Sequence, residues 1–172
     1  FFVSLLIINT LGNNSKAAIE AIGYITKVCS DCEIINICSE NINNCEGCYH
    51  CLLVNPGLCR IKDDFEKIDK LFMKCDNLIF ISKTTFDFID FQTKKILERF
   101  LPIVTFFSEY RDNELRNIRR YKKNYSFGII YEGEADREYI NYWFERASSQ
   151  LGATCLGVYP ISETKELIKC IC

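Results

Sequence analysis

Apolar residues along the chain fall into two alternating patterns, short continuous runs and stretches with helical spacing. The segments 3–8, 77–82 and 125–131 contain continuous apolar runs, at 5–8, 78–81 and 129–131, which are typical of parallel strands buried on both faces. Between the runs, apolar side chains recur at the spacing of one helix face, as at Phe65, Ile68 and Leu71. The pattern predicts strands at 3–8, 32–38, 77–82, 125–131 and 153–158, and helices at 16–22, 64–74, around 96–101 and at 135–151.

Strands that alternate with helices predict an α/β fold built on a parallel sheet. Such sheets have right-handed crossovers and carry helices on both faces. Their ligands bind beyond the carboxyl ends of the strands, where the winding reverses, so the loops at 9–15, 83–89 and 132–135 are the expected ligand site. The chain has no Pro/Gly-rich linker or internal repeat, and we expect one domain over residues 1–172.

Charge and apolar content narrow the classes of partner. The 172 residues include 21 basic and 23 acidic side chains, a formal net charge of -2, which argues against a nucleic-acid or anionic-membrane partner. No apolar run approaches the roughly 20 residues that cross a bilayer, and no basic-then-apolar leader is visible. We expect a cytoplasmic protein with a small-molecule partner. The basic stretch at 111–123 is interpreted as a solvated helix end.

The loop after the first strand has the composition of an anion site. Thr10, Asn14 and Ser15 offer polar side chains, Gly12 allows close backbone approach, and a predicted helix follows. A helix amino terminus presents free N–H groups and partial positive charge, which suits a phosphate. Neither a P-loop lysine nor a G-x-G-x-x-G motif is present. The alternative is that Asn14 or Ser15 simply caps the helix.

Cysteine is unusually frequent, with 11 residues, an odd number that cannot all pair within one chain. A chain with an apolar core and no secretion signal favours reduced thiols over a disulfide scaffold. Four of them form the pattern C-x2-C-x2-C-x7-C, which comprises Cys45, Cys48, Cys51 and Cys59.

Two motifs give the chain a family resemblance. The text around the four cysteines contains C-E-G-C-Y-H-C, then P-G-L-C and Asp63-Asp64, and residues 91–100 read F-Q-T-K-K-I-L-E-R-F. Both segments resemble the NAD(P)H-dependent FMN reductase group of flavodoxin-like proteins, which includes the iron-sulfur flavoproteins. The resemblance implies a doubly wound, five-stranded parallel sheet in the order 2-1-3-4-5, with FMN bound.

Carried over residue by residue, the resemblance implies a cofactor site on three loops. The FMN phosphate would lie on Thr10, Gly12, Asn14 and Ser15. The flavin ring would lie against Thr84, Thr85, Phe86 and Asp87, with Glu132 and Gly133 closing the far side. Aromatic side chains such as Phe86 can stack on a flavin or contact its edge.

The function implied by the resemblance is an oxidoreductase in which NADH or NADPH reduces the flavin, and the flavin then reduces a quinone, another flavin or another small acceptor. The alternative is an electron-transfer protein without substrate turnover of its own, which relays electrons between redox partner proteins. The resemblance also implies a homodimer or a higher homo-oligomer.

Three interpretations of the four cysteines stay open. Their spacing lets one loop surround a 4Fe–4S cluster, as in ferredoxin-like runs. Alternatively, Cys45, Cys48 and Cys51 lie on one face of a short helix and pack as small buried residues. Tetrathiolate zinc ranks third, because it usually draws two C-x2-C pairs from separated turns.

Overall fold

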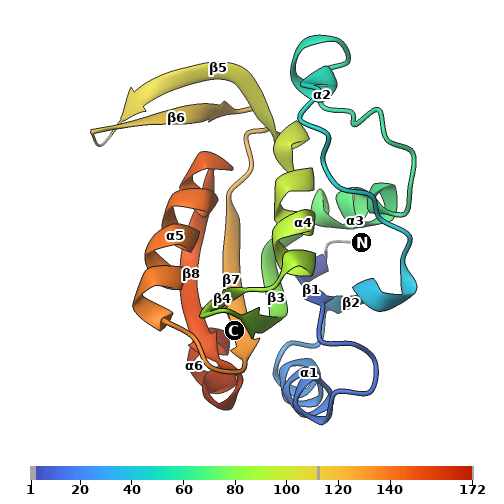
Figure 1. Cartoon of the computed structure of the whole chain (residues 1–172), viewed down its shortest axis with the longest axis vertical. Coiled ribbons are helices and arrows are strands. Elements are labelled where there is room, and N and C mark those ends of the chain that lie inside the picture. The colour runs from blue at the N-terminus through green and yellow to red at the C-terminus, as the bar shows by residue number, and fades with distance from the viewer. Residues whose placement is uncertain (1–2, 112, 172) are drawn as a thin grey trace.

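Five parallel strands in the order β2-β1-β3-β7-β8 form the centre of the fold (Figure 1). The structure is a computed structural model that describes residues 3–111 and 113–171. The predicted strand order, 2-1-3-4-5, is confirmed. The strands of both sheets are β1 (Val3–Asn9), β2 (Cys32–Asn36), β3 (Cys75–Thr85), β4 (Phe88–Ile89), β5 (Val104–Arg111), β6 (Glu114–Arg119), β7 (Tyr125–Glu132) and β8 (Ala153–Pro160).

Continuous apolar runs become the inner strands because these strands are covered on both faces. Leu5 to Ile8 in β1 and Leu78 to Ile81 in β3 are fully buried, and the two runs lie in register, with Ile7 opposite Ile79. Burying an Ile or Leu side chain stabilises a fold by about 1.5–3 kcal/mol. The inner strands therefore contribute much of the core.

Helices cover both faces of the sheet, as predicted. Side chains of α3, α4 and α5 share one buried cluster with residues of the sheet, and those of α1 and α6 share the other. The helices are α1 (Lys16–Val28), α2 (His50–Leu53), α3 (Phe65–Phe72), α4 (Phe91–Arg99), α5 (Arg137–Gln150) and α6 (Thr164–Ile168), with 3-10 turns η1 (Ile37–Ser39), η2 (Leu101–Ile103) and η3 (Ile161–Glu163). No helix among residues 3–111 and 113–171 has the length and apolarity to cross a membrane.

Two antiparallel pairs add to the predicted elements. The short strand β4 folds back on the end of β3. The basic stretch at 111–123, predicted as a helix end, instead contributes β6 and part of β5, which form a two-stranded ribbon. Figure 1 shows this ribbon projecting from the end of the fold opposite β4. The ribbon exposes Phe106, Phe107 and Tyr110.

Candidate functional site

Three loops meet at the carboxyl edge of the sheet. The strands β1, β3 and β7 are neighbours, with Asn9 opposite Ile81 and Lys83 opposite Glu132. The Thr84 hydroxyl donates to the Glu132 carbonyl over 3.1 Å, which ties the second loop to the third. The loops that the sequence indicated for ligand binding are therefore adjacent in space.

Thr10 ties the first loop to the second, and this turns its side chain inward. Its backbone N–H donates to the Ile81 carbonyl over 2.9 Å, and its hydroxyl lies 3.1 Å from Thr93 Oγ1. Thr93 Oγ1 donates in turn to Ser82 Oγ over 2.7 Å. All three side chains are buried. Thr10 therefore positions the first loop against the second, and phosphate binding by Thr10 stays a prediction.

The other predicted residues of the first loop lie at the start of α1. Gly12 has a φ of +92°, a conformation that side-chain-bearing residues rarely adopt. Ser15 caps the helix, and its Oγ accepts from the Ala18 N–H over 3.2 Å, so the capping interpretation is confirmed for this residue. Asn14 is exposed. The loop thus brings the exposed Asn14 amide and a glycine with positive φ to the amino terminus of α1.

The second loop is a strained turn that presents an aromatic ring. Phe86 and Asp87 link β3 to β4 with φ values of +52° and +58°, and Thr85 pairs with Phe88 across the turn. Two-residue turns of this kind strongly prefer Asn and Gly, because both central residues have positive φ. Phe86 is 97% exposed. Backbone strain of this kind clusters at ligand-binding sites, so the turn is a candidate for ligand contact.

The third loop approaches the second through a glycine. Gly133 has a φ of +116°, and a Cβ at this position would overlap the Thr84 hydroxyl. Glu132 and Gly133 are both exposed. Only glycine lets the backbone pass this close to Thr84, which accounts for the residue type at this position.

The four motif cysteines lie on one segment but do not form a ligand group. No set of three or more His, Cys, Asp or Glu side chains within the described parts of the chain is arranged to hold a metal ion. Cys51 is buried, Cys48 is exposed, and Cys45 and Cys59 are half-buried. Burial, and then the nearby Cys59 and Cys45 thiols, raise the pKa of Cys51 to about 11. Of the three closely spaced cysteines only Cys51 lies in a helix, α2, so the shared helix face is wrong for the other two.

Residues Asn43 and Asp63, on either side of the four cysteines, are held together by a buried arginine. Arg99, at the end of α4, donates to both carboxylate oxygens of Asp63 over 2.8 and 3.1 Å, and to the Asn43 carbonyl over 2.7 Å. Both charged side chains are 1% exposed. Burial opposes the charge on Asp63, but hydrogen bonds from Arg99 and from the Asn43 backbone lower its pKa to about 2. Asp63 and Arg99 each belong to one of the two motifs, but their 36-residue separation hides the ion pair from sequence patterns.

Most of the described cysteines, the four of the motif included, agree with the expectation of reduced thiols. Nine described cysteines are free, whereas Cys29 is disulfide-bonded, so the expectation is wrong at that position.

Comparisons with known proteins agree with the fold and the motifs. No family model matches the chain. An iron-sulfur flavoprotein of Methanocaldococcus jannaschii is 29% identical over 92 residues, which are 54% of this chain and 47% of that protein. An iron-sulfur flavoprotein of Archaeoglobus fulgidus is 31% identical over 91 residues, 53% of this chain and 40% of that protein. The match thus spans less than half of each relative's length.

A solved structure supports the fold over nearly the whole chain. The NAD(P)H:quinone oxidoreductase from Methanothermobacter marburgensis superposes with a TM-score of 0.60 and 12% identity, covering 99% of this chain and 94% of that one. By its motifs, its sequence relatives and its strand order, the chain resembles the iron-sulfur flavoprotein and FMN reductase group of flavodoxin-like proteins.

Proposed function

We propose that this protein is an FMN-dependent oxidoreductase in which NADH or NADPH reduces the flavin and the flavin reduces a small acceptor. The observation that carries the proposal is the carboxyl edge of the sheet, where three adjacent loops present a helix amino terminus and a strained, exposed aromatic turn. The sequence relatives, which are named as flavoproteins, support the same class of cofactor.

The residues at this edge fit FMN in most of their chemistry. Gly12, Asn14 and Ser15 would hold the phosphate at the amino terminus of α1, where the helix dipole favours an anion. The turn at Phe86 and Asp87 would contact the flavin ring. Thr10 fits differently from the sequence interpretation, because its hydroxyl is already bonded within the core.

The chain's contribution to the reaction is to bind and orient. Bound FMN supplies the hydride and electron chemistry. Phe86 would cover the flavin ring and limit access of water, and Thr84 and Thr85 would place the backbone of the second loop beside it. The bond from Thr84 to Glu132 and the tight approach of Gly133 keep the second and third loops at a fixed separation, which preorganises the site.

Among the described residues, no three of the four cysteines are arranged to hold a metal ion, although Cys59, Cys45 and Cys48 lie near enough to Cys51 to raise the pKa of its thiol. A 4Fe–4S cluster stays a prediction of the sequence spacing, and iron and sulfide analysis of protein purified without oxygen would test it.

Flavin binding is tested by reconstitution. Purified protein is incubated with FMN and desalted, and we expect visible flavin absorbance to remain with the protein. Phe86→Ala should keep the fold, since this side chain is 97% exposed, but should weaken FMN binding by roughly twofold to tenfold, the effect of losing one aromatic contact. Phe107→Ala, at a 72% exposed phenylalanine on the distant ribbon, is the matched control. A wild-type protein that retains no flavin would contradict the proposal.

Turnover separates the enzyme from the electron-transfer alternative. The FMN-loaded protein should oxidise NADH or NADPH steadily when a quinone or free flavin is supplied. A protein that binds FMN but oxidises neither nucleotide would instead support the electron-transfer alternative. Sedimentation equilibrium of the same preparation would test the predicted homodimer.

A further inference from the structure

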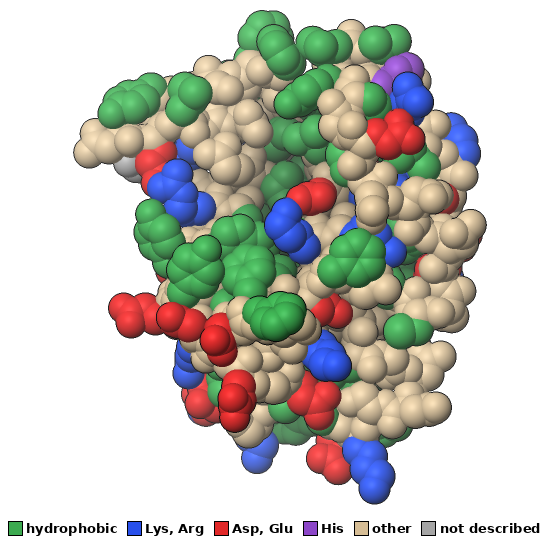
Figure 2. Space-filling view, in the orientation of Figure 1, with side chains coloured by type: hydrophobic (Ala, Val, Ile, Leu, Met, Phe, Trp, Pro, Cys, Tyr) green, Lys and Arg blue, Asp and Glu red, His purple; other side chains and the backbone are tan. Residues whose placement is uncertain are grey.

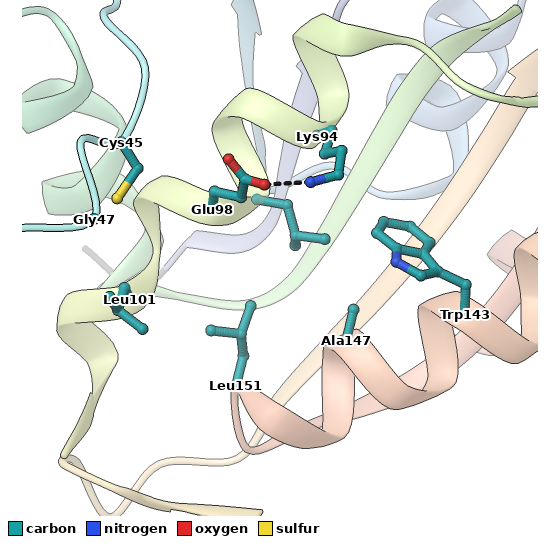
Figure 3. A pocket seen from close by; sticks show the side chains of 9 residues that line it. Cys45, Gly47, Lys94, Glu98, Leu101, Trp143, Ala147 and Leu151 are labelled. Atoms are coloured by element: carbon teal, nitrogen blue, oxygen red, sulfur yellow. Dashed lines mark hydrogen bonds and ion pairs between the residues drawn. The ribbon is translucent and has the colours of Figure 1, made fainter. Parts of the chain in front are cut away.

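The amino-terminal turn of α4 carries a fully buried hydroxyl group, that of Thr93. The outer side of the same helix is a separate surface, where Lys94 and Glu98 form an ion pair beside a cleft between α4 and α5 (Figure 3). Figure 2 shows this face as a hollow lined by apolar side chains, with a basic and an acidic side chain together at its margin. Thr93 does not line the cleft. Its side chain therefore acts on the interior of the protein.

A chain of three buried hydroxyl groups passes through Thr93 and joins the first loop to the second. Thr93 Oγ1 lies 3.1 Å from Thr10 Oγ1 and donates to Ser82 Oγ over 2.7 Å. Ser82 donates in turn to the Lys83 carbonyl over 2.9 Å. Each hydroxyl has a single proton to donate. Because the proton of Thr93 is used on Ser82, Thr10 is the donor in its contact with Thr93. The chain thus runs in one direction, from the first loop to the start of the second.

The helix turn that carries Thr93 is itself fixed to the second loop. Asp90 caps α4, and its Oδ1 accepts from the Thr93 backbone N–H over 2.9 Å. The backbone N–H of Asp90 donates to the Lys83 carbonyl, also over 2.9 Å. Thr93 is therefore held through its backbone on one side and through its hydroxyl on the other, which preorganises both loops.

We propose that Thr93 is a positioning residue, which sets the separation of the first and second loops and thereby the affinity for FMN. The link between the loops depends only on the hydrogen bonds described. That the ligand is FMN rests on the proposed function. The proposal also gives a role to the threonine of the F-Q-T-K-K-I-L-E-R-F motif, which does not belong to any of the three loops.

Thr93→Val cuts this link without leaving a hydroxyl proton unpaired. The substitution exchanges the hydroxyl for a methyl group of similar size. Thr10 then has the Ile81 carbonyl as an acceptor, 3.2 Å away, and Ser82 keeps its bond to Lys83. Burial of an unpaired donor is the costly consequence of losing a hydrogen bond, and the variant avoids it. We therefore expect Thr93→Val to fold.

The first measurement is the dissociation constant of FMN, followed by flavin fluorescence. Thr93→Val should weaken binding by about threefold to tenfold. Thr93→Ser keeps the hydroxyl but loses the methyl group, and it should bind within about twofold of wild type. Thr164→Val is the matched control, because Thr164 is also buried but donates within its own turn, to the Ile161 carbonyl over 2.6 Å. Lys94→Met controls for changes on the outer side of α4. Both controls should bind FMN as wild type does.

The second measurement needs no cofactor. Hydrogen exchange of the FMN-free protein reports on the backbone amides of Thr10 and Asp90, which both donate to carbonyl groups of β3. These amides should exchange faster in Thr93→Val than in wild type. In Thr164→Val they should exchange at the wild-type rate.

Ser82→Ala guards against misfolding of the first variant. It cuts the same chain one link further on and should also weaken FMN binding. Equal FMN binding by wild type, Thr93→Val and Ser82→Ala would overturn the inference. Weaker binding by Thr93→Ser than by Thr93→Val would also overturn it, because the methyl group and not the hydroxyl would then matter. A wild-type protein that retains no FMN would overturn the proposed function. In that case faster exchange in Thr93→Val would still support the link between the loops, and unchanged exchange would refute it.

Discussion

Replacing Arg99 by methionine should destabilise the protein strongly. Methionine keeps part of the apolar side chain but removes the guanidinium, which leaves the Asp63 carboxylate buried without its ion-pair partner. Breaking a buried ion pair by removing one partner typically costs about 3–5 kcal/mol. The Asn43 carbonyl also loses a 2.7 Å bond. Since whole domains are stable by about 5–15 kcal/mol, this change should remove a large fraction of the free energy of unfolding.

Urea unfolding at pH 7, followed by the fluorescence of Trp143, measures the effect. Lys94→Met is the matched control, because Lys94 forms an exposed ion pair with Glu98 on the same helix. Exposed pairs contribute about 0–1 kcal/mol, so this control should unfold nearly as wild type does. If Arg99→Met lowered the free energy of unfolding no more than Lys94→Met, the structural role given to Arg99 would be wrong.

The pH dependence of the same measurement has a defined sign. The pKa of Asp63 falls from 3.8 to about 2 in the folded protein, a shift worth about 2 kcal/mol. This stabilisation is fully present above pH 4 and is lost as the pH falls through 2. In Arg99→Met, burial without the partner should raise the pKa of Asp63 instead. The difference in stability between the two proteins should therefore shrink as the pH is lowered from 5 to 2.

Two further predictions concern backbone conformation and thiol exposure. Gly133→Ala should destabilise the protein by about 1–3 kcal/mol, because φ at this position is +116° and the added methyl overlaps Thr84. The same variant should retain less FMN after desalting. Gly23→Ala, in open space on α1, is its control and should stabilise the protein by up to about 1 kcal/mol. Cys75 is fully buried, and burial raises its pKa to about 12, whereas Cys170 is exposed. Iodoacetamide at pH 8 should therefore alkylate Cys170 and not Cys75 in the native protein. Peptide mass mapping would measure this.

The main sheet could be predicted because its signal is local. A strand buried on both faces is apolar at nearly every position, so the apolar run at 78–81 predicts such a strand without reference to the rest of the chain. The β5–β6 ribbon could not be found in this way. Its side chains are mostly exposed, so no apolar face marks it, and its charges fit a solvated helix end equally well. The pairing of two exposed strands depends on the turn between them and on the partner strand. The pattern of apolar residues within one strand carries no information about either.

The site was predictable to the level of loops but not of side-chain direction. Ligands of such sheets bind beyond the carboxyl ends of the strands. Topology alone therefore places Thr10, Phe86 and Gly133, which follow three of these strand ends, near one another. The inward turn of Thr10 depends on Thr93, 83 positions further along the chain. The Arg99–Asp63 pair likewise joins residues 36 positions apart. The members of each pair lie far apart in the sequence, and only the fold shows that they are in contact.

The β5–β6 ribbon has a consequence for how the molecule opens. The ribbon pairs only with itself, presents most of its side chains to solvent, and lies at the end of the fold away from the proposed flavin loops. Elements with few buried side chains unfold locally at a much lower free energy than the core. We expect ribbon amides to exchange with deuterium well before those of β3 and β7. The ribbon would then act as a separate cooperative unit, whose opening leaves the cofactor edge intact.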